Sequence, residues 1–139
     1  MTLESRGYVA DTAKDGKEAI TKANANFYNL ALIDIRLPDM EGTNLLTRLK
    51  ETTPAMVKII ITGYPSLQNA MEAVNKNADG YIVKPFETEQ LLSMIEAHLK
   101  KQKEARQYSE QKVAEYVEKR IGQLDKANEN LGSRKPGQS

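Results

Sequence analysis

Four short apolar runs alternate with segments of helical periodicity over the first hundred residues. The runs cover residues 8–13, 30–33, 57–61 and 81–83. This alternation is typical of parallel strands that are joined by helical crossovers. The second and third runs contain few polar residues, as strands do when helices cover both faces of a sheet. We therefore predict a parallel α/β sheet with these two runs as its central strands.

Helical periodicity marks the segments between the apolar runs. The predicted helices cover residues 16–25, 42–51, 66–77 and the chain from residue 87 onward. Asp15, Pro54 and Pro65 stand at the boundaries of these segments, where helix caps and turns are found.

The last predicted helix is unusually long, because residues 87–131 contain no proline and one glycine, Gly122. Its first part carries an apolar face suited to packing on the sheet: Leu91, Leu92, Ile95 and Leu99. Farther on, steps of three and four form the seam of a short coiled coil with a polar inner position: Ala114, Val117, Ile121, Leu124, Asn128 and Leu131. The seam has fewer than three heptads, so a lone solvated helix is the alternative.

Length and composition fit one compact domain with extensions. The chain has 139 residues, of which 40% are hydrophobic. We predict a domain over residues 1–99, a helical extension over residues 100–131 and a disordered tail over residues 132–139. The absence of cysteine excludes disulfides and thiolate metal sites. No apolar run approaches the roughly 20 residues of a membrane span, so we predict no membrane contact and a cytoplasmic location.

The formal net charge of +1 conceals an asymmetry between the two parts of the chain. Residues 1–99 carry 10 basic and 13 acidic side chains, whereas residues 100–139 carry 10 basic and 6 acidic ones. The charges of the second part alternate in sign, which is typical of a solvated helix face. Tyr108 and Tyr116 are its only aromatic residues. We therefore predict no binding of nucleic acid.

Polar residues end three of the predicted strands. Asp34 ends the second run, Thr62 the third and Lys84 the fourth. In a parallel α/β sheet the carboxyl ends of the strands lie at one edge, where reactive groups collect. A carboxylate, a hydroxyl and an ammonium group at that edge form a plausible phosphoryl-transfer site, with the carboxylate as nucleophile.

These residues resemble the receiver domain of two-component response regulators. The segment LIDIRLPDMEG is similar to the phosphoacceptor motif of that family, which makes Asp34 the implied acceptor. IIITGYP is similar to the segment that carries the hydroxyl residue, here Thr62. GYIVKPF is similar to the segment of the phosphate-binding lysine, here Lys84, and implies a cis bond before Pro85. Tyr81 takes the position of the family's switch aromatic residue.

The resemblance implies magnesium chemistry at Asp34. An acyl phosphate brings about two negative charges beside a carboxyl group, and the family uses magnesium to offset them. Asp34 and the backbone carbonyl of Arg36 would supply two of the six oxygen ligands. An acidic pair after the first strand supplies others. Lys84 and Thr62 would bind phosphoryl oxygens.

The first residues depart from the family pattern, because residues 3–20 resemble the end of its first helix and its second strand. The first strand and its acidic pair have no counterpart, and Asp11 and Asp15 align elsewhere, so we expect magnesium binding to be weak or absent. In the flavodoxin-like strand order 2-1-3-4-5 the missing strand would lie beside residues 30–33. Residues 8–13 could move there, another chain could pair there, or the first segment could detach.

Our interpretation is a truncated receiver domain in two-component signalling. It predicts impaired or absent phosphorylation of Asp34, no enzymatic activity, and action by contact with a histidine kinase or phosphotransfer protein, as a homodimer. The alternative is a small phosphatase of the haloacid dehalogenase type with Asp34 as nucleophile, although Arg36 stands where that family has its general acid. A third interpretation is a fragment of a longer, ordinary receiver.

Overall fold

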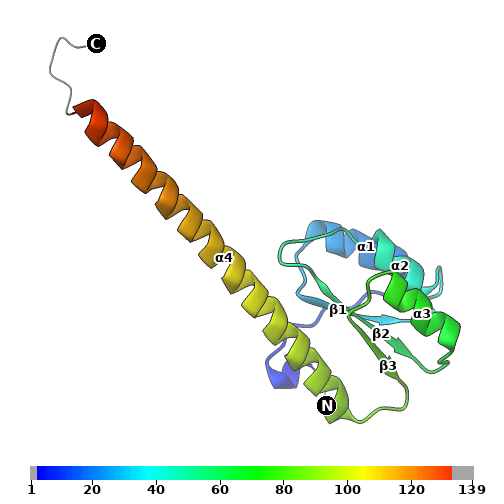
Figure 1. Cartoon of the computed structure of the whole chain (residues 1–139). Helices are drawn as coiled ribbons and strands as arrows, with labels where there is room; N and C mark the ends of the chain where they lie inside the picture. Colours follow the sequence, from blue (N-terminus) through cyan, green and yellow to red (C-terminus); the bar gives the residue numbers. More distant parts are fainter. Residues whose placement is uncertain (1–2, 133–139) are drawn as a thin grey trace. The chain divides into compact units, whose positions relative to one another are not determined.

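The computed structural model describes the backbone of residues 3–132 and the side chains of residues 3–127 (Figure 1). Its elements are η1 (Glu4–Arg6), α1 (Gly16–Ala25), β1 (Leu30–Asp34), α2 (Gly42–Arg48), β2 (Val57–Thr62), α3 (Leu67–Asn75), β3 (Gly80–Val83) and α4 (Thr88–Gly132). The chain divides into two units, Met1–Lys103 and Glu104–Ser139, which are described separately below.

The first unit is built on a parallel sheet with the strand order β1-β2-β3. Leu30 pairs with Val57 at the start of the first ladder, and Ile59 pairs with Gly80 at the start of the second. Ile59 and Ile60 of the central strand are completely buried, because β2 has a strand on each side and a packed layer on each face. The predicted parallel α/β fold with a long final helix is confirmed.

Helices cover both faces of this sheet (Figure 1). On one face, Ala23 of α1, Leu45 of α2 and Ala73 of α3 pack with Ile33 and Ile60 in one core cluster. A second cluster on the other face joins sheet residues to the first turns of α4: Val57, Ile59, Ile82, Leu91 and Ile95. The two clusters explain why β1 and β2 are apolar along their length.

The prediction of a strand at residues 8–13 is wrong. The segment forms no strand, and the described residues contain a sheet of three strands rather than four. A strand persists only where a neighbouring strand satisfies its backbone groups. Here the polar groups of Asp11 and Thr12 are bonded toward α1 and Tyr28 instead.

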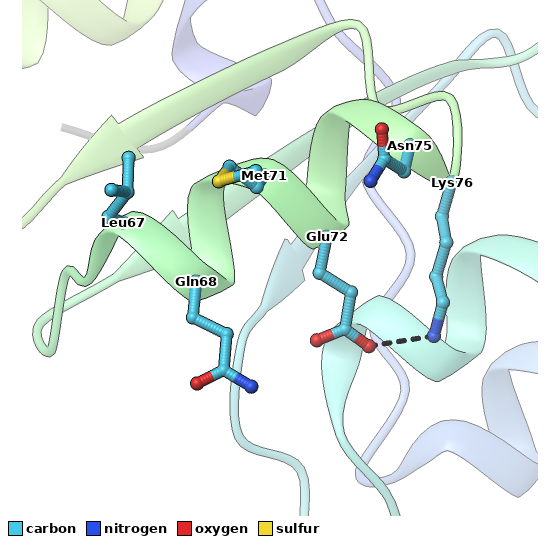
Figure 2. Close-up of a pocket in the computed structure, with 6 residues that line it drawn as sticks. All are labelled: Leu67, Gln68, Met71, Glu72, Asn75 and Lys76. Atoms are coloured by element: carbon cyan, nitrogen blue, oxygen red, sulfur yellow. Dashed lines mark hydrogen bonds and ion pairs between the residues drawn. The ribbon is translucent and has the colours of Figure 1, made fainter.

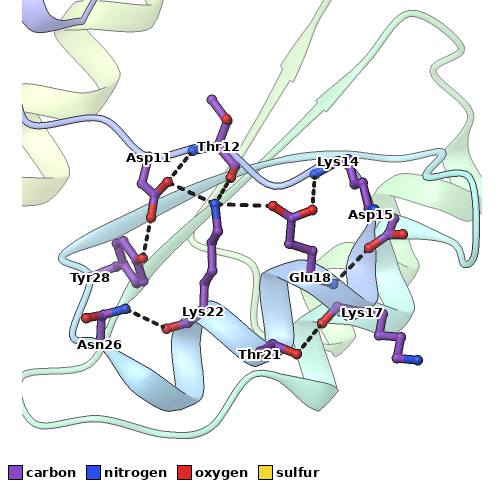
Figure 3. Close-up of polar contacts among 10 residues, drawn as sticks. All are labelled: Asp11, Thr12, Lys14, Asp15, Lys17, Glu18, Thr21, Lys22, Asn26 and Tyr28. Atoms are coloured by element: carbon purple, nitrogen blue, oxygen red, sulfur yellow. Dashed lines mark hydrogen bonds and ion pairs between the residues drawn. The ribbon is translucent and has the colours of Figure 1, made fainter.

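A polar network around Lys22 holds this segment against α1 (Figure 3). The Lys22 ammonium donates to Asp11 Oδ1 at 3.0 Å and to the carbonyl oxygen of Thr12, and it lies 3.2 Å from Glu18 Oε1. The Tyr28 hydroxyl donates to Asp11 Oδ2 at 2.7 Å. These five residues are called the Lys22 network below. With these contacts, residues 8–13 form no ladder with β1 and stay attached to α1.

Acidification is expected to loosen the Lys22 network. Hydrogen bonds from Tyr28 and then Lys22 lower the pKa of Asp11 below its ordinary value of 3.8. Bonds from Lys22 and the Lys14 amide lower the pKa of Glu18 below 4.5. A carboxylate with a depressed pKa stabilises the fold above its unfolded pKa, and this contribution is lost as the pH falls through the folded pKa. Amide protection in residues 8–15 should therefore decrease below about pH 4.5. The Asp11→Asn variant, measured by the same hydrogen exchange, should show a weaker dependence on pH.

The second unit, described by itself, is the continuation of α4 over residues 104–127. Most of its side chains are exposed, including the apolar Val113, Val117, Ile121 and Leu124. Asn128 and Leu131 of the predicted seam lie outside the residues whose side chains are described, and the predicted tail 132–139 lies outside the description except for Gly132, which ends α4. None of the helices in the described part of the chain combines the length and the apolar character of a membrane span.

Candidate functional site

Three polar side chains come from the carboxyl ends of neighbouring strands. Asp34 ends β1, Thr62 ends β2, and Lys84 directly follows β3. The strand register places Asp34 beside Ile61 and Thr62 beside Val83. All three residues therefore lie at one edge of the sheet, as the order of the apolar runs predicts.

Asp34 and Lys84 form an ion pair. Lys84 Nζ lies 2.9 Å from Asp34 Oδ1, and the two side chains are 49% and 54% exposed, respectively. An ion pair this accessible to water adds little to stability. It also places one positive charge beside the carboxylate that would have to act as nucleophile. The peptide bond between Lys84 and Pro85 is cis, as the resemblance implies.

Thr62 is almost completely buried, with a relative exposure of 1%. Its Oγ1 accepts a hydrogen bond from the backbone N–H of Tyr64 at 2.9 Å, and its carbonyl oxygen accepts one from the Lys84 N–H at 2.7 Å. These bonds fix the loop after β2 and the position of Lys84 relative to β2. The hydroxyl hydrogen of Thr62 remains available for donation to an oxygen atom at the site.

Tyr81 lies on β3 and packs against the core cluster that contains α1, α2 and α3. Its hydroxyl oxygen is buried, and no hydrogen-bond partner for it occurs within the described part of the chain. A buried hydroxyl without a partner costs about 1–3 kcal/mol. This cost offsets part of the free energy that is gained when the Tyr81 ring packs against the core.

Arg36 and Tyr64 were not recognised as a pair in the sequence. The guanidinium carbon of Arg36 lies 4.6 Å from the centroid of the Tyr64 ring, which is cation–π geometry. Arg36 follows Asp34 by two positions, and Tyr64 follows Thr62 by two positions, so the pair lies on the two loops that carry the site. No motif signals this contact, because it depends on how the two loops approach each other.

Gly42 belongs to the phosphoacceptor motif, and its close packing at the site is not apparent from the sequence. A Cβ atom at this position would lie 2.0 Å from the carbonyl oxygen of Asp34. The Gly42 N–H donates to the carbonyl oxygen of Ile35 at 2.6 Å. The start of α2 therefore rests directly on the backbone that carries Asp34, and a side chain has no room there.

Three other aspartates, Asp39, Asp15 and Asp11, are engaged elsewhere. Both carboxylate oxygens of Asp39 accept backbone N–H groups at the start of α1, from Gly16 at 2.8 Å and from Lys17 at 2.9 Å. These hydrogen bonds lower the pKa of Asp39, and the one from Gly16 has the larger effect. Asp15 caps α1 by accepting the Glu18 N–H. Figure 3 shows Asp15 at this cap and Asp11 in the Lys22 network.

A magnesium ion prefers several hard oxygen ligands in near-octahedral geometry. Among the residues that the structure describes, no three His, Cys, Asp or Glu side chains gather in a group that could hold a metal ion. Asp34 offers one carboxylate, already paired with Lys84, and Arg36 offers a backbone carbonyl. The described residues do not fit a magnesium site of the kind that receiver domains use.

Comparison with known proteins identifies the family. The sequence model of the response regulator receiver domain family matches residues 1–96 of this chain. The response regulator ArlR of Staphylococcus saprophyticus is 38% identical over 104 residues, which are 73% of this chain and 46% of that protein. Its counterpart in Staphylococcus aureus strain Mu50 is 32% identical over 102 residues, with the same coverage. The chain thus spans about half the length of these curated relatives.

Solved structures agree with this assignment. A CheY-like receiver domain protein from Methanospirillum hungatei JF-1 is 44% identical, with a TM-score of 0.70 over 74% of this chain and 82% of that one. The beryllofluoride-activated NtrC4 receiver domain dimer is 36% identical, with a TM-score of 0.66 over 72% of this chain and 83% of that one. The chain belongs to the response regulator receiver domains of two-component signalling.

Proposed function

We propose that this chain acts in two-component signalling as a protein-contact module in which Asp34 is a poor phosphoacceptor. The surroundings of Asp34 carry this proposal. Its carboxylate is paired with Lys84 at 2.9 Å, and the described residues assemble no acidic cluster beside it. The expected output is binding to a histidine kinase or a phosphotransfer protein rather than a phosphorylation-driven change.

The charge balance at Asp34 supports this proposal. A phosphoryl group transferred to Asp34 brings close to two negative charges into contact with the protein. Lys84 supplies one positive charge next to Asp34 Oδ1. The other nearby cation, the guanidinium group of Arg36, is stacked on the Tyr64 ring. Without a bound divalent cation, part of the developing charge stays uncompensated, which raises the barrier for transfer.

A magnesium titration tests the metal part of the proposal. We expect the amide signals of Asp34 and Arg36 in nuclear magnetic resonance spectra to show no saturable shift at millimolar magnesium. One carboxylate and one carbonyl group are too few ligands for this ion. The Asp34→Asn variant is the matched control, since it removes the carboxylate and keeps the shape. A saturable shift that disappears in this variant would contradict the proposal.

The contact surface in this proposal is the exposed side of α3 with the neighbouring β3 and the start of α4. Leu67, Met71 and Val74 of α3 are 78%, 56% and 71% exposed, although each is apolar. Figure 2 shows a shallow pocket along the same helix, whose lining includes Leu67, Met71 and the ion pair of Glu72 with Lys76. Exposed apolar groups next to charges are typical of protein-binding surfaces.

We propose further that the helical extension pairs with a second copy. Val113, Val117, Ile121 and Leu124 follow one another in steps of four, four and three, and each is at least 45% exposed. Association would remove these apolar side chains from water. A receiver domain similar to this chain has been solved as a dimer, which supports the proposal without specifying its interface.

Disulfide trapping tests the pairing of the extension, because the chain contains no cysteine of its own. In a parallel, in-register pair, Val117→Cys should form an interchain disulfide under mild oxidation, since seam residues from two helices face each other. Lys119→Cys, on the opposite side of the same helix turn, is the matched control. Equal cross-linking of both variants, or none with Val117→Cys, would rule out the predicted seam.

A further inference from the structure

The second unit carries its apolar residues as one stripe along α4, which runs without interruption to Gly132 (Figure 1). Ala114, Val117, Ile121 and Leu124 alternate steps of three and four, and the last three are 45%, 52% and 52% exposed, respectively. This alternation keeps the four residues on one side of the helix, as the inner positions of a two-stranded coiled coil require. They are the described part of the seam.

Charges on the side of the helix opposite the seam are matched within the same helix. Lys112 Nζ lies 3.7 Å from Glu115 Oε2 and 5.4 Å from the centroid of the Tyr108 ring. Residues three or four positions apart on a helix are neighbours, so such contacts form within a single chain. The outer side of the extension therefore needs no second molecule to balance its charges.

Charges along the two borders of the seam are arranged differently. Glu118 and Asp125 lie on one border, Arg120 lies on the other, and all three side chains are exposed. Arg120 donates a hydrogen bond of 3.5 Å to Gln123. Glu118 and Asp125 form neither a hydrogen bond nor an ion pair with the residues that the structure describes. One border is thus acidic, the other carries the arginine, and the two acids are not neutralised within their own helix.

We infer that these borders select a parallel, in-register pair of two copies; the inference rests on the pairing of the extension proposed above and adds its orientation. In a parallel pair, each border of one helix lies beside the opposite border of the second helix. Arg120 of each copy then lies beside Asp125 of the other copy. Glu118 of each copy lies beside the apolar Val113 of the other. The contact between opposite charges is reciprocal, so it forms on both sides of the pair.

An antiparallel pair would bring like charges together. When the same seam is aligned in opposite directions, each border lies against its own copy, so Glu118 faces Glu118 and Arg120 faces Arg120. Such juxtaposition of like charges opposes association. The borders of this helix complement each other only across a parallel pair, which identifies a second copy of the chain as the occupant of the seam.

Disulfides between two copies report their orientation directly. Ala114→Cys and Leu124→Cys mark the two ends of the described seam, about 15 Å apart along the helix axis. The two variants are mixed under reducing conditions and then oxidised mildly, and the products are distinguished by mass. A parallel pair should give disulfides between identical variants. A mixed disulfide between the two variants would overturn the inference, because it requires an antiparallel pair.

Charge exchange tests the role of Arg120 and Asp125 in the unmodified seam. Arg120→Glu should raise the dissociation constant, measured by sedimentation equilibrium, about tenfold, because both ion pairs become contacts between like charges. Adding Asp125→Lys to this variant should restore the constant to within about threefold, since opposite charges face each other again. Lys119→Glu is the matched control, because it makes the same change in net charge on the outer side of the helix and should have little effect.

These measurements separate the orientation from the pairing on which it rests. A dimer whose dissociation constant does not respond to Arg120→Glu, or responds equally to Lys119→Glu, would overturn the role of the borders while the extension still pairs. An unmodified chain that stays monomeric at every concentration would contradict the pairing itself, and the orientation with it.

Discussion

Gly42→Ala should destabilise the first unit by about 3 kcal/mol or more, because backbone overpacking at a buried position exceeds the usual cost of one extra methyl group. The added Cβ would lie 2.0 Å from the Asp34 carbonyl oxygen and 2.9 Å from its carbonyl carbon. The Gly42 N–H donates to the Ile35 carbonyl oxygen at 2.6 Å, so the start of α2 cannot move away without breaking this hydrogen bond. Relief requires a shift of the strand end that carries Asp34. Urea unfolding followed by circular dichroism measures the loss.

Gly122→Ala is the matched control for this substitution. Nothing lies within 4 Å of a Cβ atom at Gly122, which is in the interior of α4. Alanine is favoured over glycine in a helix by about 1 kcal/mol, so this variant should not lose stability. If Gly42→Ala unfolds at the same urea concentration as the unmodified chain, α2 does not approach the Asp34 backbone as closely as the structure has it.

Incubation with acetyl phosphate and magnesium should leave Asp34 almost unlabelled. Charge stabilisation by a metal ion contributes several kcal/mol to the transfer of phosphoryl groups, and each 1.36 kcal/mol changes a rate about tenfold. The single carboxylate at the site should therefore react at least about 100-fold more slowly than a receiver domain with a complete acidic site. A receiver domain known to be labelled by acetyl phosphate is the reference for the same reaction.

Local sequence signals were sufficient for most of the fold and for the three polar residues of the site. Asp15 accepts the Glu18 N–H as the cap of α1, so this helix begins where the sequence predicts it. Asp34, Thr62 and Lys84 could be found because each ends an apolar run, and parallel strands bring such ends together. Helix α2 ends at Arg48 rather than at residue 51, since Leu49 takes an extended backbone conformation and is buried in the core.

The features that could not be predicted depend on contacts between distant residues. Residues 8–13 form an apolar run like those of the strands, but a strand also requires a neighbour, and such a run contains no information about one. The bonds from Gly16 and Lys17 to Asp39 join segments that are far apart in the chain. The stacking of Arg36 on Tyr64 likewise depends on the approach of two loops. Such contacts arise from the tertiary structure and leave no local pattern.

We propose that Asp34, which is paired with Lys84 where the described residues offer too few ligands for a metal ion, is not phosphorylated and that the domain acts by protein contact. Intact-mass spectrometry after incubation with acetyl phosphate, with and without magnesium, tests it most directly, beside the Asp34→Asn variant. We predict that the mass of the folded protein stays unchanged while the reference receiver gains one phosphoryl group. A magnesium-dependent phosphoryl adduct that is absent from Asp34→Asn would contradict the claim, because it would show that the chain forms a working metal site and accepts a phosphoryl group at Asp34.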